Sequence, residues 1–250
     1  MVAHVMLYQC VVKMKTYLYP VIELRMDSNG NIQMYNIKLG VLIPTRSNRP
    51  EFLEFAKQQI SSQTLQPDVI EIVDDPPLNT NKDITWRYRI GCQRLFDKKI
   101  DIIVFWEDDD FYSSNYLKTM VNLWDANGRP SCIGLADTYY YHLGIRKWLR
   151  MQHPGRASAF STLVSSKILE IKWPDDGYSF VDIDIWKQLQ GKSLKIDMLT
   201  LGIKGYGQGA LFGGIGHSEK WTAYRNDDSD LAWLKEKTGE SFSFYERFTR

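Results

Sequence analysis

Cysteine is scarce in this sequence, and its positions show no pairing pattern. The three cysteines, Cys10, Cys92 and Cys132, lie far apart in a chain of 250 residues. An odd number of cysteines without paired spacing excludes the usual zinc sites and small disulfide scaffolds. The simplest interpretation is a reduced protein of the cytoplasm.

Long hydrophobic runs are also missing. The apolar residues near the N-terminus are interrupted by Lys13 and Lys15, well before the ~20 residues that a membrane-spanning helix needs. No small-residue cleavage site follows them. We therefore expect neither a signal peptide nor a membrane anchor.

An excess of charge of either sign is absent. The 31 Lys and Arg residues are balanced by 30 Asp and Glu residues, which gives a formal net charge of +1. This balance provides no overall field that would recruit nucleic acid or an anionic membrane, so any polyanion must bind locally. The hydrophobic content of 44% is enough for a sizeable core, and we expect one main domain.

The first 38 residues carry a hairpin pattern. Two β-rich runs, Tyr17 to Leu24 and Ile32 to Ile37, flank Asp27-Ser28-Asn29-Gly30, and an Asn-Gly pair favours a tight hairpin turn. We predict a β-hairpin extension over residues 1–38, which serves as a structural edge or as a contact between subunits of a homo-oligomer.

Short apolar runs and helical patterns alternate in the next part of the chain. This β-α-β-α-β order favours a mostly parallel, Rossmann-like α/β sheet with helices on both faces, in which ligands gather at the carboxyl ends of the strands. The predicted elements are strand Leu39 to Ile43, helix Pro50 to Ile60, strand Val69 to Val73, helix Trp86 to Phe96 and strand Ile100 to Trp106.

The second half of the chain is less regular. Ser158 to Ser166 reads as a strand or turn that enters a helix, and Tyr178 to Gln190 as a helix. We expect a strand over Leu194 to Ile203 and a helix over Asp230 to Lys237, capped by the run Asp227-Asp228-Ser229.

All three predicted parallel strands end in polar residues: Thr45-Arg46, Asp74-Asp75 and the acidic run Glu107 to Asp110. Consecutive carboxylates after a buried strand repel one another, so they need a cation or a basic partner. Oxygen ligands suit Mg²⁺ or Mn²⁺. The alternative is a solvated helix N-terminus, where acidic residues also stabilise the helix dipole.

The order of these motifs resembles family 2-like glycosyltransferases of the GT-A fold. The resemblance rests on Pro44-Thr45-Arg46, Val73-Asp74-Asp75, and Phe105 to Asp110 followed by Tyr116-Leu117. It covers most of Leu39 to Gln190. It implies a GT-A domain over 39–250, with a nucleotide-sugar half at about 39–125, an acceptor half at about 126–225 and a C-terminal helix at about 229–250.

The resemblance also implies roles for single residues. The expected donor is a UDP-sugar. Its nucleoside would be held by Pro44, Thr45, Arg46 and Asp75, with Asp74 as the alternative to Asp75. Asp108 and Asp110 would hold the Mn²⁺ or Mg²⁺ that bridges the diphosphate, with Asp109 beside the donor as a replacement ligand. His217 would complete the metal shell. Arg89 would pair with the diphosphate, as guanidinium does with phosphate; the alternative is an exposed helical arginine.

Phe180 to Trp186 contains two candidates for the catalytic base. Glycosyl transfer with inversion needs a carboxylate that accepts the proton of the acceptor hydroxyl. By resemblance this is Asp182, with Asp184 as the fallback. The alternative for both is an ordinary acidic residue in the first turn of a helix.

The acceptor region is expected between the acidic run and Asp182. Tyr139 to His142, Arg146 to Arg150 and His153 to Arg156 combine aromatic and cationic side chains, which suit a sugar or an unstacked base. The acceptor would be a glycan, a lipid-linked glycan or a hydroxylated DNA base of the kind that some viral glycosyltransferases modify. The alternative is a half-buried aromatic strand with a solvated basic turn.

Two other functions compete with glycosyl transfer. A nucleotidyltransferase also uses carboxylates and Mg²⁺, but it typically needs a glycine-rich phosphate loop after the first strand, and Pro44 to Arg49 contains no glycine. The glycine-rich run from Gly205 to Gly216 lacks the strand-turn-helix context of a dinucleotide site; Ser218 to Trp221 after it would form a flap over the diphosphate. A non-catalytic sugar- or nucleic-acid-binding protein is the third possibility.

Overall fold

The computed structural model describes residues 22–26, 32–76, 83–178, 180–207, 217–218 and 223–249. The chain divides into two compact units, residues 1–36 and 37–250. In the first unit, β1 (Ile22–Met26) pairs with β2 (Ile32–Asn36) in antiparallel fashion. The predicted turn at Asp27 to Gly30 lies outside the described residues.

A six-stranded sheet forms the centre of the second unit, with the strand order β11-β7-β10-β5-β3-β4. β3 (Leu39–Pro44) lies between β4 (Val69–Val73) and β5 (Ile102–Phe105), and both neighbours run parallel to it. The predicted α/β class and the β-α-β-α-β order are therefore confirmed, and the carboxyl ends of these three strands meet at one edge of the sheet.

The remaining strands make this sheet mixed. β10 (Thr162–Ser165) runs antiparallel to both β5 and β7 (Cys132–Leu135), whereas β11 (Lys192–Leu194) runs parallel to β7. An antiparallel strand at the centre of the sheet was not predicted, since a buried apolar run carries no information about its direction.

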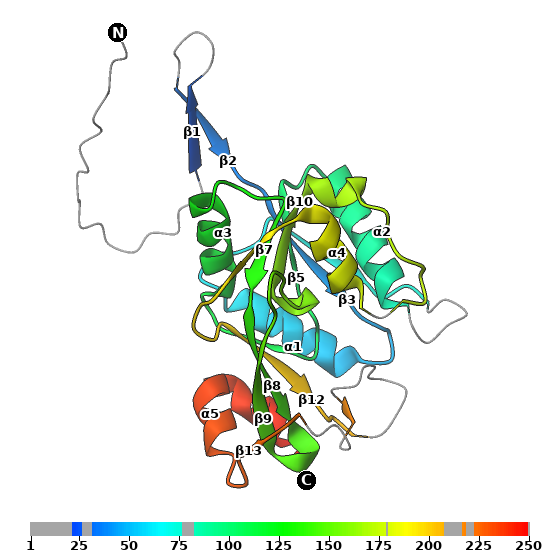
Figure 1. Ribbon diagram of the computed structural model, residues 1–250, viewed down its shortest axis with the longest axis vertical. Coiled ribbons are helices and arrows are strands. Elements are labelled where there is room, and N and C mark those ends of the chain that lie inside the picture. The colour runs from blue at the N-terminus through cyan, green and yellow to red at the C-terminus, as the bar shows by residue number, and fades with distance from the viewer. Residues whose placement is uncertain are drawn as a thin grey trace, which may run out of the picture. The chain divides into compact units, whose positions relative to one another are not determined.

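Helices cover both faces of the six-stranded sheet. Because β4 and β5 lie on opposite sides of β3, two right-handed crossovers place α1 and α2 on opposite faces. Figure 1 shows α2 and α4 on one side of the sheet and α3 on the other. The bounds are α1 (Pro50–Ser61), α2 (Ile84–Asp97), α3 (Tyr116–Ala126) and α4 (Val181–Leu189).

A buried apolar cluster joins α2 and α4 to the sheet. Tyr88 and Leu95 of α2 and Trp186 of α4 pack with Leu42 and Phe105 of the strands. Burial of such side chains stabilises the fold by roughly 1.5–3 kcal/mol each. The cluster fixes the first turn of α4 against the sheet edge at which β5 ends.

A second sheet of five strands, in the order β13-β9-β8-β12-β6, lies beyond that edge. Its inner strand β12 pairs with β8 in parallel and with β6 in antiparallel fashion. The bounds are β6 (Phe111–Tyr112), β8 (Asp137–His142), β9 (Lys147–Gln152), β12 (Thr200–Lys204) and β13 (Asn226–Asp227), and short 3-10 helices cover Leu143–Ile145, Ala159–Ser161, Ser166–Glu170 and Gly239–Ser241.

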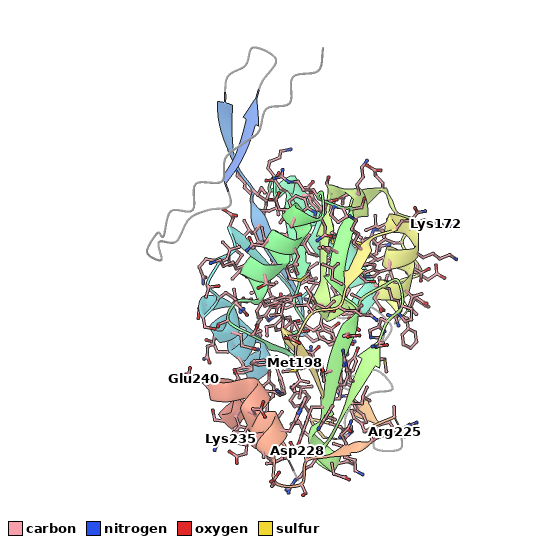
Figure 2. The ribbon with its side chains drawn as sticks, turned by 60° about the vertical axis from the view of Figure 1, so that its left-hand side comes forward. Lys172, Met198, Arg225, Asp228, Lys235 and Glu240 are labelled. Carbon is pink, nitrogen blue, oxygen red and sulfur yellow. The ribbon has the colours of Figure 1, made fainter. Side chains whose placement is uncertain are left out.

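The C-terminal helices α5 (Ala232–Thr238) and α6 (Phe242–Glu246) pack on one face of the second sheet. The carboxylate of Asp228 accepts hydrogen bonds from the backbone N–H groups of Trp233 at 2.9 Å and Leu234 at 3.0 Å. Figure 2 shows Asp228 beside this helix. The predicted acidic cap is therefore present, although the helix begins two residues later than Asp230.

The predicted strand from Leu194 to Ile203 is wrong. Leu194 ends β11 in the first sheet, and β12 begins only at Thr200 in the second sheet. The chain crosses between the sheets in this interval, which contains Lys195 and Asp197. The predicted helix at Tyr178 likewise begins later, at Val181. Among the described residues, no helix is both long enough and apolar enough to cross a membrane.

Candidate functional site

The acidic run Glu107 to Asp110 occupies the connection between the two sheets. β5 ends at Phe105 in the first sheet and β6 begins at Phe111 in the second. Asp108 and Asp110 have no exposed surface and Asp109 retains 7%. These carboxyl groups therefore lie inside the protein, which does not fit the alternative of a solvated helix N-terminus.

Three of the four acidic side chains converge. Glu107, Asp109 and Asp110 each offer a carboxylate oxygen, and these oxygens lie within 4.8 Å of one another. We call these residues the acidic triad. The Tyr88 hydroxyl donates a hydrogen bond to Glu107 Oε1 at 3.1 Å, so the position of Glu107 is set by the core helix α2.

Asp110 joins the triad to strand β12. Its Oδ1 accepts hydrogen bonds from the backbone N–H of Ile203 at 2.8 Å and from Lys204 Nζ at 3.0 Å. Its Oδ2 is buried and has no hydrogen-bond partner among the described residues. A buried carboxylate oxygen without a donor is costly, and a cation bound by the triad would satisfy it.

Asp108 is held by residues at the end of β3 and the start of α1. Its Oδ2 accepts a hydrogen bond from Thr45 Oγ1 at 2.5 Å, and its Oδ1 accepts one from Arg49. Arg49 also lies 3.7 Å from Asp109. The structure thus brings the predicted residues Thr45, Asp108, Asp109 and Asp110 together, but it engages Asp108 with donors of the protein itself.

Burial dominates the electrostatics of the cluster. Desolvation raises the pKa of Asp108 to about 7 and raises the pKa values of Glu107 and Asp110. At Asp109 the desolvation is outweighed by Lys204, Arg49 and His217, so its pKa is lowered. The carboxylates keep Lys204 protonated despite its burial, because they raise its pKa.

An oxygen-only donor set of this kind fits a hard divalent cation such as Mg²⁺ or Mn²⁺. The unpartnered Oδ2 of Asp110 supports that fit. The four carboxylates of residues 107–110, when ionised, exceed the charges of Arg49 and Lys204 by two. One divalent ion would neutralise this excess.

His217 lies near the triad but is engaged elsewhere. Its Nδ1 accepts a hydrogen bond from the backbone N–H of Gly205 at 3.2 Å, and burial followed by repulsion from Lys204 lowers its pKa to about 3. A neutral ring that accepts through Nδ1 carries its proton on Nε2. It would have to give up the bond to Gly205 before it could bind a metal.

The residues predicted to hold the nucleoside separate into two groups. Pro44 ends β3 and Thr45 follows it beside the acidic run, and Arg46 donates to Asp83 at 2.7 Å. Asp75 instead accepts two hydrogen bonds from Arg94, at 2.9 and 3.0 Å, which lower its pKa. Asp74 is exposed.

Sequence reasoning missed the buried pair of Asp83 and Arg87. Arg87 donates to the carbonyls of Val73 at 2.8 Å and Asp75 at 2.9 Å, and to the carboxylate of Asp83 at 2.8 Å. The pair fixes the backbone that follows β4. Its i,i+4 spacing at the start of a helix is a signal that the sequence does contain.

Arg89 pairs with an aspartate outside the acidic triad. It forms an ion pair with Asp176 at 2.9 Å, and its side chain is 43% exposed. This geometry favours the alternative of an exposed helical arginine.

Asp182 and Asp184 lie in the first turn of α4 but face different surroundings. Asp182 accepts from Arg156 at 2.5 Å, and burial raises its pKa against the effect of Arg156. The charge of Asp182 raises the pKa of Glu107, so it lies near the triad. Asp184 instead lines a groove of about 300 Å³ together with Lys172, Trp173, Pro174, Lys187 and Gln188.

The predicted acceptor region contains a buried polar network. His153 Nε2 lies 2.9 Å from Thr138 Oγ1 and 3.1 Å from Ser158 Oγ, and Ser158 Oγ lies 2.7 Å from the Tyr140 hydroxyl. On the opposite face of β8, Tyr141 stacks on Trp233 of α5. Much of this aromatic strand therefore packs, as the alternative interpretation predicts.

The buried His153 is expected to make stability depend on pH. Burial, aided by Arg156, lowers its pKa from 6.5 to about 4. The unfolded chain therefore binds more protons than the folded protein between these values, so stability is full above pH 6.5 and falls as the pH drops toward 4. This group alone accounts for a loss of up to about 3 kcal/mol.

The measurement is urea unfolding at pH 7.5 and pH 5 for the wild type and His153→Gln. The variant should show a smaller difference between the two pH values. The same pH dependence in both proteins would show that His153 is not the titrating group.

Comparison with known proteins gives likenesses of fold only. No family model and no curated protein matches the chain. Among solved structures it is similar to S. aureus TarS in complex with UDP-GlcNAc (TM-score 0.48, 14% identity, 71% of this chain and 62% of that chain). It is also similar to TarS in complex with UDP (0.48, 9%, 66% and 60%) and to a cytidylyltransferase from Leptospira borgpetersenii serovar Hardjo-bovis (0.43, 16%, 66% and 78%).

The chain thus spans about 60% of the length of these TarS chains. At these identities and scores the likenesses describe the course of the backbone, and the function has to be argued from the site itself.

Proposed function

We propose that this protein is a metal-dependent glycosyltransferase that moves a sugar from a nucleotide-diphosphate donor, a UDP-sugar above all, to an acceptor hydroxyl. The observation that carries the proposal is the acidic triad at the carboxyl end of β5, in which Asp109 and Asp110 are buried. Ligands of parallel α/β sheets gather at such edges.

The triad provides the metal site of the proposal. Glu107, Asp109 and Asp110 would hold Mn²⁺ or Mg²⁺, and His217 would be an additional ligand. Asp108, which is bonded to Thr45 and Arg49, would be a replacement ligand. The bound ion supplies charge that stabilises the leaving diphosphate. Thr45, Arg46 and the region of Asp74 and Asp75 would contact the nucleoside, and Arg89 remains a candidate for the diphosphate only if it leaves Asp176.

Asp182 is the proposed base, with Asp184 as the fallback. A partly buried carboxyl with a raised pKa is a suitable proton acceptor near neutral pH, and Arg156 holds it in position at 2.5 Å. This role implies an inverting transfer. The acceptor would be a glycan, a lipid-linked glycan or a hydroxylated DNA base that approaches from the side of Tyr140 and Arg156.

Nucleotidyl transfer is the second candidate, because the same triad would serve a nucleoside triphosphate. The loop from Pro44 to Arg49 contains no glycine, and it places the side chains of Thr45 and Arg49 against Asp108. It therefore does not present the backbone cradle that a triphosphate needs.

Thermal unfolding with a panel of nucleotide sugars, nucleoside diphosphates and nucleoside triphosphates, each with and without Mn²⁺, tests the function. We expect a rise in melting temperature with a nucleoside-diphosphate sugar that depends on Mn²⁺. A protein stabilised only by triphosphates would be a nucleotidyltransferase. A protein that binds none of these compounds would not be a glycosyltransferase.

A further inference from the structure

Lys204 stands out among the basic residues because its side chain is buried in the acidic site. It is the last residue of β12, its side chain is 12% exposed, and its Nζ lies 3.0 Å from Asp110 Oδ1. A lysine is rarely buried to this extent unless it is paired. Nothing in the proposed catalytic roles uses it.

The neighbours of Lys204 are the residues of the acidic triad. Its ammonium group interacts electrostatically with Asp110, Asp109 and Glu107, whose oxygens converge within 4.8 Å. The ammonium and a divalent ion would therefore draw on the same three carboxylates. Like charges at such separations repel strongly inside a protein.

We propose that the charge of Lys204 opposes binding of the divalent metal to the acidic triad and thereby sets the metal affinity of the site. In the metal-free protein it neutralises part of the buried charge and keeps the connection between the two sheets folded. When the metal binds, Asp110 Oδ2 is available to it, whereas Oδ1 stays with Lys204 and the Ile203 N–H.

This inference rests on the metal site of the proposed function, but its test uses the metal alone. Mn²⁺ binding to the apoprotein is measured by isothermal titration calorimetry for the wild type, Lys204→Met and Lys204→Arg. Loss of the positive charge in Lys204→Met should tighten Mn²⁺ binding at least tenfold. Lys204→Arg keeps the charge, so its affinity should stay within about threefold of the wild type.

Lys98→Met is the matched control. Lys98 also pairs with a carboxylate, Glu71 at 2.6 Å, but it lies at the end of α2, outside the triad. Its removal should leave the Mn²⁺ affinity unchanged. Lys204→Gln removes the charge but keeps a hydrogen-bond donor for Asp110, and it keeps the test decisive if the Met variant does not fold without metal.

Thermal unfolding supplies a second measurement. Without metal, Lys204→Met should melt below the wild type, because the triad has lost a counter-ion, and saturating Mn²⁺ should raise its melting temperature more than that of the wild type. Equal or weaker Mn²⁺ binding in the folded Lys204→Met or Lys204→Gln variant overturns the proposal. So does a wild type that binds no Mn²⁺ at all. A nucleotide sugar that binds without any effect of Mn²⁺ would leave glycosyl transfer standing and still reject this role for Lys204.

Discussion

Replacing Asp110 by Asn should lower the Mn²⁺-dependent affinity for the nucleotide sugar at least 100-fold. Asp110 is fully buried, and its Oδ2 has no hydrogen-bond partner among the described residues. An amide keeps the size of the side chain but removes the charge that a divalent ion needs. The affinity is measured by isothermal titration calorimetry with and without Mn²⁺.

Two control variants test whether the loss is specific to Asp110. Asp125→Asn alters an aspartate of α3 that is 49% exposed and pairs with Arg129, so donor affinity should not change. Asp108→Asn removes a carboxylate that contacts Thr45 and Arg49 rather than the triad, so it should impair metal binding less than Asp110→Asn. Unchanged affinity in Asp110→Asn would refute the metal site, and a larger loss in Asp108→Asn would restore Asp108 as a ligand.

Local patterns predicted the first half of the fold well. The apolar run of β3 and the helical spacing of α1 and α2 identify their own elements, and a β-α-β order determines the parallel pairing of β3 with β4 and β5. The meeting of Thr45 with Asp108 follows from this topology, because both residues come after the ends of neighbouring strands.

The second sheet could not be predicted in the same way. β6 and β13 contain two residues each, which is too short for any periodicity to be read. β8 and β12 are parallel strands about 60 residues apart in the chain, and no turn signal connects them. The sequence pattern therefore did not reveal that the chain crosses between the sheets from Leu194 to Thr200, and it predicted one continuous strand there.

The two basic residues of the site, Lys204 and Arg49, could not be predicted from the sequence for a related reason. Lys204 is 94 residues away from Asp110 in the sequence, and Arg49 is 59 residues away from Asp108. The acidic run indicated that cations were required, but only the tertiary structure shows that the protein supplies two of them. With these two cations, the uncompensated negative charge that a metal would have to neutralise falls from four to two.

Replacing Asp182 by Asn should lower the rate of sugar transfer by about 10²- to 10⁴-fold and leave donor binding unchanged. The amide is nearly the same size, so the packing of α4 is kept, but it cannot accept the proton of the acceptor hydroxyl. Transfer is measured with a radiolabelled nucleotide sugar under single-turnover conditions, and binding is measured separately by calorimetry.

Asp184→Asn is the decisive comparison, because the two aspartates share one helical turn and differ in what they face. Asp182 lies against Arg156 and influences Glu107, whereas Asp184 lines the groove beside Trp173. If Asp182 is the base, Asp184→Asn should retain most of the transfer rate. Full activity in Asp182→Asn together with loss in Asp184→Asn would move the base to Asp184. Full activity in both variants would mean that α4 supplies no base, and an inverting mechanism through this helix would be excluded.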